Sequence, residues 1–205
     1  MKRVSDSLMF KHRGWLGIAF LVPVSIAAIF TLPIIKEDSF LDLLANLLGW
    51  ICFVLYVTFR IWATLYVGGR KDRELQTEGP YSMTRNPLYF GSFCLALSVT
   101  LFLKSFSLLI AALIASFFYA SHVIAAEEKV LEGIFGEQYS EYARKTPRLF
   151  PNLSLYRGLD SISVNLREVR REAARLWLGA LIPLLAELVM HLRVSAWWPH
   201  WFSLP

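Results

Sequence analysis

The 205-residue sequence is poor in charge: 18% of its residues are Asp, Glu, Lys or Arg, whereas about a quarter is usual in soluble domains. Its two cysteines, Cys52 and Cys94, both lie inside apolar runs, so they predict neither a disulfide framework nor a metal site. The four histidines are scattered and none is paired with a cysteine at ligand spacing. We therefore expect no metal to be bound.

The motifs of several common enzyme classes are also missing from the sequence. It contains no G-x-G-x-x-G after a strand and no P-loop, which argues against a dinucleotide-binding or NTPase domain. It contains no H-E-x-x-H and no G-x-S-x-G, which argues against a zinc protease or an α/β-hydrolase. No internal repeat or low-complexity linker appears, so we expect one membrane domain over residues 1–205.

Apolar residues, by contrast, make up 56% of the chain and gather in runs. The runs cover residues 14–35, 43–66, 88–103, 106–126 and 176–192. A membrane-crossing helix needs about 20 predominantly apolar residues. The sequence therefore predicts an all-α fold, a polytopic transmembrane helical bundle of four to five spans with cytoplasmic amphipathic helices.

The last apolar run, residues 176–192, leaves two alternatives open. It is short for a span and contains Pro183 and Glu187, so it either crosses the bilayer or lies in the interface. The tail that follows carries Trp197, Trp198 and Trp201, which is typical of an aromatic belt at a membrane surface.

The distribution of charge predicts the orientation of the spans. The N-terminal tail, residues 68–87 and residues 127–175 are basic, the turn at 36–42 is acidic, and the turn at 104–105 is minimal. Basic loops face the cytoplasm, so we place the N-terminus and the basic segments there. This bias also accounts for the net charge of +5 without a nucleic-acid partner.

The first candidate site lies between Glu78 and Gly91. Asn86 and Pro87 are typical of the cap and first position of a helix, and capping is the simplest interpretation of Asn86. Arg85 stands beside this helix N-terminus, where free N–H groups and the helix dipole favour an anion. The alternative interpretation is therefore a carboxylate or phosphate site, with Tyr89 one turn further along.

The second candidate site is the pair Glu127 and Glu128 at the inner end of the fourth predicted span. Residues 127, 131, 134, 135, 138 and 142 recur at helical spacing, so we expect Glu127 to share the apolar face. Gly133 and Gly136 predict an interruption or an end of that helix, followed by a short helix over 138–144.

A carboxylate on an apolar face is costly unless it is paired. One interpretation is a salt bridge from Glu127 to Arg85 or Arg148. The other is a site for the ammonium of a ligand or for a substrate proton. Arg60 is a third candidate, because a cation in the inner half of a span is either functional or extends to the interface.

At these positions the chain resembles the membrane methyltransferase family that includes isoprenylcysteine carboxyl methyltransferases and phospholipid N-methyltransferases. The first matching block is Gly79-Pro80-Tyr81 with Arg85-Asn86-Pro87-Leu88-Tyr89-Phe90-Gly91. The second is Glu127-Glu128-Lys129-Val130-Leu131 with Phe135-Gly136-Glu137-Gln138-Tyr139-Ser140-Glu141-Tyr142 and Pro147-Arg148-Leu149-Phe150-Pro151. The resemblance covers residues 50–151, with 152–205 as a C-terminal extension, and is strongest to bacterial members.

The resemblance implies transfer of a methyl group from S-adenosylmethionine to a lipid or lipid-anchored acceptor at the cytoplasmic face of a bacterial inner membrane. It implies Arg85 and Glu128 as catalytic residues and Arg60 and Arg148 as substrate-binding residues. The cofactor-binding residues that it implies are Tyr81, Arg85, Asn86, Tyr89, Glu127, Glu128, Tyr139 and Tyr142.

The sequence departs from the isoprenylcysteine branch at Asn86, where that branch has histidine, so a prenyl-cysteine acceptor is not implied. Two other classes remain as alternatives. Membrane sterol reductases resemble this fold but use NADPH, and they favour a different block at the position of Glu127-Glu128. The third class is a non-catalytic membrane scaffold.

Overall fold

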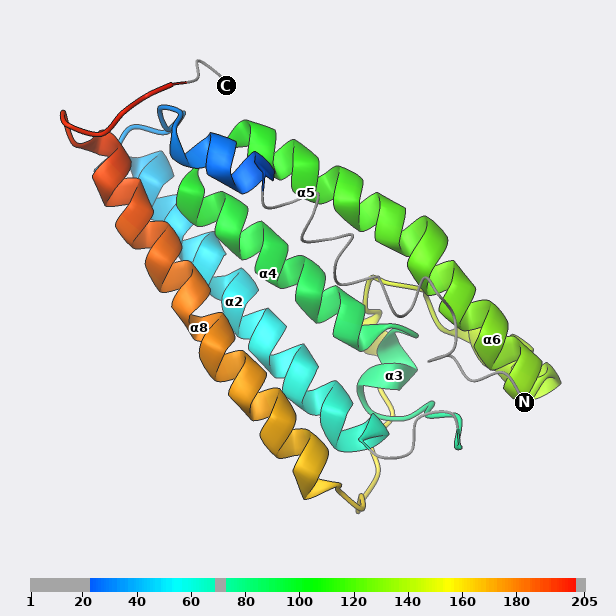
Figure 1. Ribbon diagram of the computed structural model, residues 1–205. Helices are drawn as coiled ribbons and strands as arrows, with labels where there is room; N and C mark the ends of the chain where they lie inside the picture. Colours follow the sequence, from blue (N-terminus) through cyan, green and yellow to red (C-terminus); the bar gives the residue numbers. More distant parts are fainter. Residues whose placement is uncertain (1–22, 69–72, 202–205) are drawn as a thin grey trace.

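The computed structural model describes residues 23–68 and 73–201, and this part of the chain is helical with no β-sheet (Figure 1). The helices are α2 (Phe40–Val67), α3 (Pro80–Met83), α4 (Pro87–Leu103), α5 (Phe106–Phe118), α6 (Ala125–Phe135), α7 (Glu137–Lys145) and α8 (Leu166–Val194). A π-helix (Tyr119–Ile124) joins α5 to α6, and a 3-10 turn (Leu153–Leu155) precedes α8. The all-α prediction is confirmed for these residues.

Three helical stretches are long and apolar enough to cross a membrane, which makes the chain an integral membrane protein. They are Phe40–Val67, Phe106–Phe135 and Leu166–Val194. The α4 helix is a shorter apolar helix of 17 residues. The stretch beginning at Phe106 continues nine residues beyond the predicted end at Ala126, because the π-helix connects α5 and α6 without a break.

The first nine residues of the first predicted span, Gly14 to Ile35, lie outside the described residues. In its described part, residues 23–29 are helical and residues 31–35 are not. The predicted end at Ile35 is therefore wrong. The physical reason is Pro33, which lacks an N–H group and disfavours helical backbone at the residue before it.

The last apolar run, residues 176–192, lies within α8. The helix begins at Leu166, ten residues before that run, where the Asn165 side chain accepts hydrogen bonds from the N–H groups of Arg167 and Glu168. The resulting helix has 29 residues and contains Pro183 without a break. By length and composition α8 is able to cross the bilayer.

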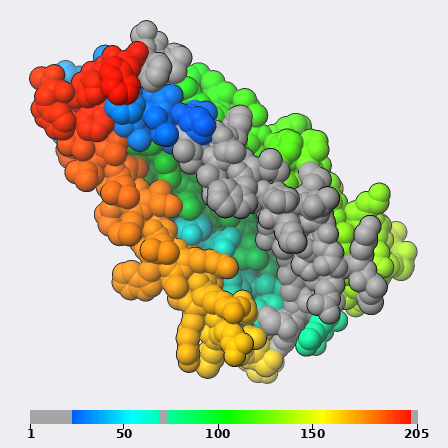
Figure 2. All heavy atoms as spheres, in the orientation of Figure 1, coloured from blue at the N-terminus to red at the C-terminus, as the bar shows by residue number. Residues whose placement is uncertain are grey.

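The helices α2, α4 and α8 pack against one another along their lengths, while α5 packs on α4 from another side (Figure 1). In the space-filling view, α8 forms a raised edge beside the recessed atoms of α2 and α4 (Figure 2). The end of α2, the start of α4, α3 and the start of α8 all lie at one end of the bundle, which we call the α3 end.

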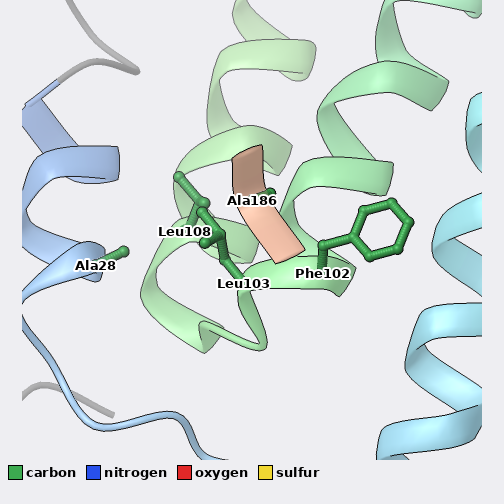
Figure 3. Packing of buried hydrophobic residues seen from close by; sticks show 5 residues of the cluster. All are labelled: Ala28, Phe102, Leu103, Leu108 and Ala186. Carbon is green, nitrogen blue, oxygen red and sulfur yellow. The ribbon is translucent and has the colours of Figure 1, made fainter. Parts of the chain in front are cut away.

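The opposite end of the bundle is closed by apolar packing. Ala28, Phe102, Leu103, Leu108 and Ala186 form one buried cluster there (Figure 3). The predicted tight hairpin between α4 and α5 is confirmed: Lys104 adopts a left-handed conformation, and Ser105 caps α5.

Two buried cations, Lys104 and Arg193, lie at the same end of the bundle. Lys104 Nζ lies 2.5 Å from Asp42 Oδ1, and the buried Arg193 donates to the carbonyl oxygens of Thr31 and Leu103. Because these charges are paired or hydrogen-bonded, burying them is tolerated. The chemistry-bearing blocks of the sequence lie at the other, α3 end.

Candidate functional site

The first sequence block forms α3 and the start of α4. Gly79 has a φ of 60°, and a Cβ atom there would lie 2.4 Å from the ring of Tyr66. Only glycine fits this left-handed position against an aromatic ring. The turn that it makes buries the Tyr81 side chain and leads through extended Thr84 to Arg85.

The segment after α7 holds this block in place from the other side. Its hydrogen bonds include Arg85 N to Pro147 O (2.9 Å), Thr84 Oγ1 to Leu149 O (2.9 Å), Asn152 N to Met83 O (3.0 Å) and Gly79 N to Arg157 O (2.7 Å). The Tyr142 hydroxyl on α7 also donates to the carbonyl oxygen of Tyr81 at 2.7 Å. The two blocks are thus one folded unit.

Glu128 is the residue at which the two blocks meet. Its side chain is 9% exposed. Its Oε1 lies 3.3 Å from Arg85 Nη1 and accepts a hydrogen bond from Asn86 Nδ2 at 3.2 Å. Its Oε2 lies 2.9 Å from both Nε and Nη2 of Arg148. One buried carboxylate therefore joins α4, α6 and the segment after α7, and the surrounding donors compensate its desolvation.

The salt bridge that we considered for Glu127 is thus made by its neighbour Glu128. Glu127 is half-buried in the first turn of α6. It lies close enough to Tyr81 that its charge, together with the larger effect of burial, raises the pKa of that phenol. The π-helix lies immediately before this turn, and such wide turns are frequent at functional sites.

Asn86 occupies the predicted cap position of α4, and Pro87 takes the first helical position. Its side chain, however, makes no capping hydrogen bond. The amide instead donates to Glu128 Oε1 and to the carbonyl oxygen of Arg148. The prediction of the helix start is confirmed, but the simple capping role is wrong because a buried carboxylate and a carbonyl attract both N–H donors.

In the part of the chain that the structure describes, Arg85 Nε and Tyr139 Oη are buried beside this network without a well-formed hydrogen bond, and the Arg85 guanidinium lies next to the Tyr139 hydroxyl. Burial raises the pKa of the Tyr139 phenol, the Glu128 carboxylate raises it further, and the Arg85 guanidinium opposes this shift. Tyr139 is therefore a neutral hydroxyl donor at ordinary pH. Buried polar groups that lack a well-formed hydrogen bond are unusual in a folded protein, so this pair is a candidate contact for a ligand.

The other predicted residues of the two sequence blocks lie either in this network or next to it. Tyr142 packs edge-on against Tyr139, with ring centroids 6.0 Å apart. Tyr89, one turn into α4, faces the Tyr119 ring of the π-helix at 6.4 Å. The predicted helix over residues 138–144 is confirmed as α7, and Gly136 ends α6 as expected, whereas Gly133 lies inside it.

Arg60 belongs to a separate cluster. Its Nε lies 2.5 Å from Glu172 Oε1 on α8, and its Nη1 donates to Ser92 Oγ on α4 at 3.2 Å. Arg175 binds the other carboxylate oxygen of Glu172 at 3.1 Å. Sequence analysis missed Glu172, whose only local signal is Arg175 three residues further along the same helix.

Comparisons with known proteins give the class to which this fold and site belong. A sequence model of the phospholipid methyltransferase family, described as "Phospholipid methyltransferase", matches residues 41–138. The match begins in α2 and ends in α7, so it contains Arg85, Asn86 and both glutamates. The chain belongs to the family of phospholipid and isoprenylcysteine methyltransferase-like membrane proteins.

Within that family the chain is similar to two bacterial proteins over most of its length. It is 34% identical to the nickel-cobalt-cadmium resistance protein NccN of Alcaligenes xylosoxydans xylosoxydans, over 98% of this chain and 93% of the relative. It is 31% identical to the cobalt-zinc-cadmium resistance protein CzcN of Cupriavidus metallidurans, over 85% of this chain and 80% of the relative.

A third relative covers a smaller part of the chain. The protein-S-isoprenylcysteine O-methyltransferase of Schizosaccharomyces pombe is 37% identical over 83 residues, which are 40% of this chain and 34% of that enzyme. No solved structure shows significant similarity to this chain.

Proposed function

We propose that this protein is an S-adenosylmethionine-dependent methyltransferase that modifies a lipid or lipid-anchored acceptor at the cytoplasmic membrane face. The observation that carries the proposal is the contact of Glu128 with Arg85, Asn86 and Arg148. This contact joins the two blocks of the sequence that resemble the methyltransferases, within the family to which the chain belongs.

The donor set at this site suits the methionine part of S-adenosylmethionine, which carries a carboxylate and an ammonium. Arg85 Nε and Tyr139 Oη are buried neighbours that lack a well-formed hydrogen bond in the described part of the chain. Both are suited to a carboxylate oxygen, and a charge-assisted bond from a guanidinium is among the stronger polar contacts. Glu127 would bind the ammonium from the first turn of α6.

The contacts of Glu128 support a role in positioning other residues rather than direct contact with the cofactor. Its two oxygens already accept from Arg85, Asn86 and Arg148. We therefore assign it as the residue that positions Arg85 and Arg148. Tyr81, Tyr142, Asn86 and Tyr89 surround the same network and would shape the rest of the cofactor site.

Bound S-adenosylmethionine supplies a methyl group that is already activated by its sulfonium. The task of the protein is then to orient the acceptor, and orientation alone can supply several kcal/mol, of the order of 7–11 in favourable cases. Arg148, half-exposed beside Glu128, and Arg60 would orient an anionic acceptor. Such an acceptor needs no base, whereas a neutral or cationic acceptor would use a glutamate to remove its proton.

The orientation in the membrane follows from charge. The described parts of two basic segments, residues 73–87 and 127–175, lie toward the α3 end, and basic segments remain on the cytoplasmic side. A site at that boundary is open to a water-soluble cofactor from the cytoplasm and to a lipid acceptor from within the bilayer.

The test is transfer of labelled methyl groups from S-adenosylmethionine into the lipid extract of membranes containing the protein. Wild-type protein is expected to label one lipid class, and Arg85→Ala is expected to lower incorporation at least tenfold. Arg144→Ala is the matched control, because Arg144 is exposed and pairs with exposed Glu137. Equal labelling by wild type and Arg85→Ala would contradict the proposed site.

A role in metal resistance is a second candidate, favoured by the nearly full-length similarity to NccN and CzcN, which are named for it. We propose that such a role would depend on methyl transfer. A deletion in the native host would be tested for growth with nickel, cobalt or cadmium and complemented with wild type or Glu128→Gln. Complementation by wild type alone is expected; equal complementation by both would separate resistance from the site.

A further inference from the structure

The cluster of Arg60, Glu172 and Arg175 is the second concentration of charge at the α3 end. Two guanidinium groups share one carboxylate, so the cluster carries one net positive charge. Arg60 comes from α2, and Glu172 and Arg175 come from α8, outside the segment that the family model matches. The C-terminal extension thus completes a cluster that begins in the shared core.

Close helix packing fixes Arg60 at this position. A Cβ atom on Gly91 would lie 3.0 Å from Arg60 Cγ, and one on Gly179 would lie 2.9 Å from the Tyr56 hydroxyl. These two glycines let α4 and α8 approach α2 at adjacent turns, around Tyr56 and Arg60. The Arg60 stem is therefore confined between helices, and its head is directed to Glu172 and Ser92 rather than extended freely to the interface.

The cluster lies near the ends of two apolar runs, on the side of the α3 end. A helix rises about 1.5 Å per residue, so Glu172 lies about 6 Å before the apolar run that starts at Leu176, and Arg60 lies about 10 Å before the end of α2. Glu172 is buried, Arg60 is one-fifth exposed and Arg175 is two-thirds exposed. The two cations are thus accessible while the anion is not.

The guanidinium groups retain donors for a ligand. A guanidinium has five N–H groups, and the contacts of Arg60 with Glu172 and Ser92 use two of them. Arg175 uses one nitrogen on Glu172. Paired guanidinium groups with a fixed spacing are the usual means by which proteins bind a phosphate or carboxylate.

The cluster also lies on the same side of the bundle as the candidate cofactor site. Tyr81 packs with Ala63 and Tyr66 at the end of α2. The charges of both Glu127 and Arg60 act on the Tyr81 phenol. Tyr81 is therefore near both Glu127 of one site and Arg60 of the other.

We propose that Arg60 and Arg175, held together by Glu172, bind the anionic headgroup of the membrane lipid that serves as acceptor. The identity of the bound lipid as the methyl acceptor rests on the proposed function. The proposal restricts the acceptor to lipids with a net negative headgroup, in which phosphate or carboxylate groups outnumber cationic groups. Helix α8 is then the element that determines which lipid is bound.

The test is native mass spectrometry of the full chain, purified in detergent and mixed with equal amounts of phosphatidylglycerol and phosphatidylcholine. Wild type is expected to retain phosphatidylglycerol at least fivefold more often. Arg60→Gln and Arg175→Gln are each expected to reduce that preference to about one. Arg175 is exposed, so its variant should fold, and Arg171→Gln is the matched control because Arg171 carries the same charge on the same helix but pairs with Glu168.

Two further binding measurements define the class of ligand. Oleate in place of phosphatidylglycerol tests whether a carboxylate is accepted; retention that depends on Arg175 would widen the headgroup class, and its absence would restrict it to phosphates. Excess inorganic phosphate should not displace the lipid, and displacement would assign the cluster to a soluble anion and overturn the proposal. An unchanged preference in both Arg60→Gln and Arg175→Gln, or an equal loss in Arg171→Gln, would also overturn it.

Binding of S-adenosylmethionine, measured on the same samples, separates this proposal from the proposed function. Intact cofactor binding with lost lipid preference in the Arg60 and Arg175 variants supports both. Cofactor binding by wild type with no lipid preference contradicts only the headgroup site. Lipid preference without cofactor binding would contradict only the methyltransferase proposal.

Discussion

The side-chain amide of Asn86 donates a hydrogen bond to Glu128 Oε1 at 3.2 Å, although the two residues lie 42 positions apart in the chain. The same amide donates to the carbonyl oxygen of Arg148 at 2.9 Å. Both contacts use the N–H donors of the side chain. A residue at a helix start thereby links α4 to α6 and to the segment after α7.

Substitution of Asn86 by Asp tests this link, because Asp has nearly the same shape but no N–H donors. The new carboxylate would face Glu128 and a carbonyl oxygen, so we expect a loss of about 1–3 kcal/mol in stability and cofactor binding at least tenfold weaker. Thermal unfolding and calorimetry measure the two effects.

Asn152→Asp is the matched control for that substitution. The Asn152 side chain acts as an acceptor, from the N–H group and hydroxyl of Ser154, and Asp keeps this acceptor. We expect near-wild-type stability and binding. If Asn86→Asp and Asn152→Asp behave alike, the amide of Asn86 has no special role.

Two tyrosines on α7 provide a second matched pair. Tyr142→Phe removes a hydroxyl that donates to the buried carbonyl oxygen of Tyr81, which should cost about 1–2 kcal/mol. Tyr139→Phe removes a buried hydroxyl that makes no well-formed hydrogen bond in the described part of the chain, so stability should change little while cofactor affinity falls. Loss of stability in Tyr139→Phe with unchanged affinity would refute the ligand role of Tyr139.

The alkaline stability of the protein should reflect the same tyrosines. Burial raises the pKa of Tyr81, Tyr139 and Tyr142 above the ordinary value in the folded chain. In the unfolded chain these phenols lose their protons near pH 10. Stability is therefore full below about pH 10 and falls as pH rises, by about 1.4 kcal/mol per pH unit for each tyrosine.

Denaturation measured at increasing pH checks this prediction, with tyrosinate absorbance reporting ionisation. The Tyr139→Phe variant should lose about 1.4 kcal/mol less stability per pH unit than wild type, because one fewer buried phenol ionises on unfolding. Ionisation of all tyrosines in the folded protein near pH 10 would show that these phenols are not buried as described.

Two glycines offer opposite predictions for substitution by alanine. Gly91→Ala places a Cβ atom 3.0 Å from Arg60 Cγ and 3.3 Å from the backbone oxygen of Tyr56. We expect the Arg60 side chain to be displaced, with at least a threefold loss of anionic-lipid preference. Gly133→Ala meets nothing within 4 Å inside α6, so it should raise stability by up to about 1 kcal/mol. An equal effect of both would argue against close packing at Arg60.

The local signals in the sequence were sufficient to predict several elements. Pro87 after Asn86 predicted the start of α4, Lys104-Ser105 predicted the hairpin, and Gly136 predicted the end of α6, because each depends on a backbone preference of one or two residues. The predicted end of the first span was wrong because the apolar run continues past Pro33, whereas the helix ends before it.

Other features depend on contacts between distant residues, which periodicity does not contain. Glu128, rather than Glu127, is the buried carboxylate of the pair, and its partners come from two other segments, the start of α4 and the segment after α7. The partner of Arg60 is Glu172, 112 positions away on a helix whose first ten residues precede the apolar run. The π-helix before Glu127 also has no recognised sequence signal in this chain.

The central claim is that Arg85 and its neighbours bind S-adenosylmethionine. Calorimetry on the detergent-purified protein, with Arg85→Ala and the exposed-site control Arg144→Ala, tests it most directly, and thermal unfolding verifies that each variant is folded. The account predicts micromolar binding of S-adenosylmethionine by wild type and Arg144→Ala, and its loss in folded Arg85→Ala. Binding of NADPH in place of S-adenosylmethionine, or equal binding of S-adenosylmethionine by all three proteins, would contradict it.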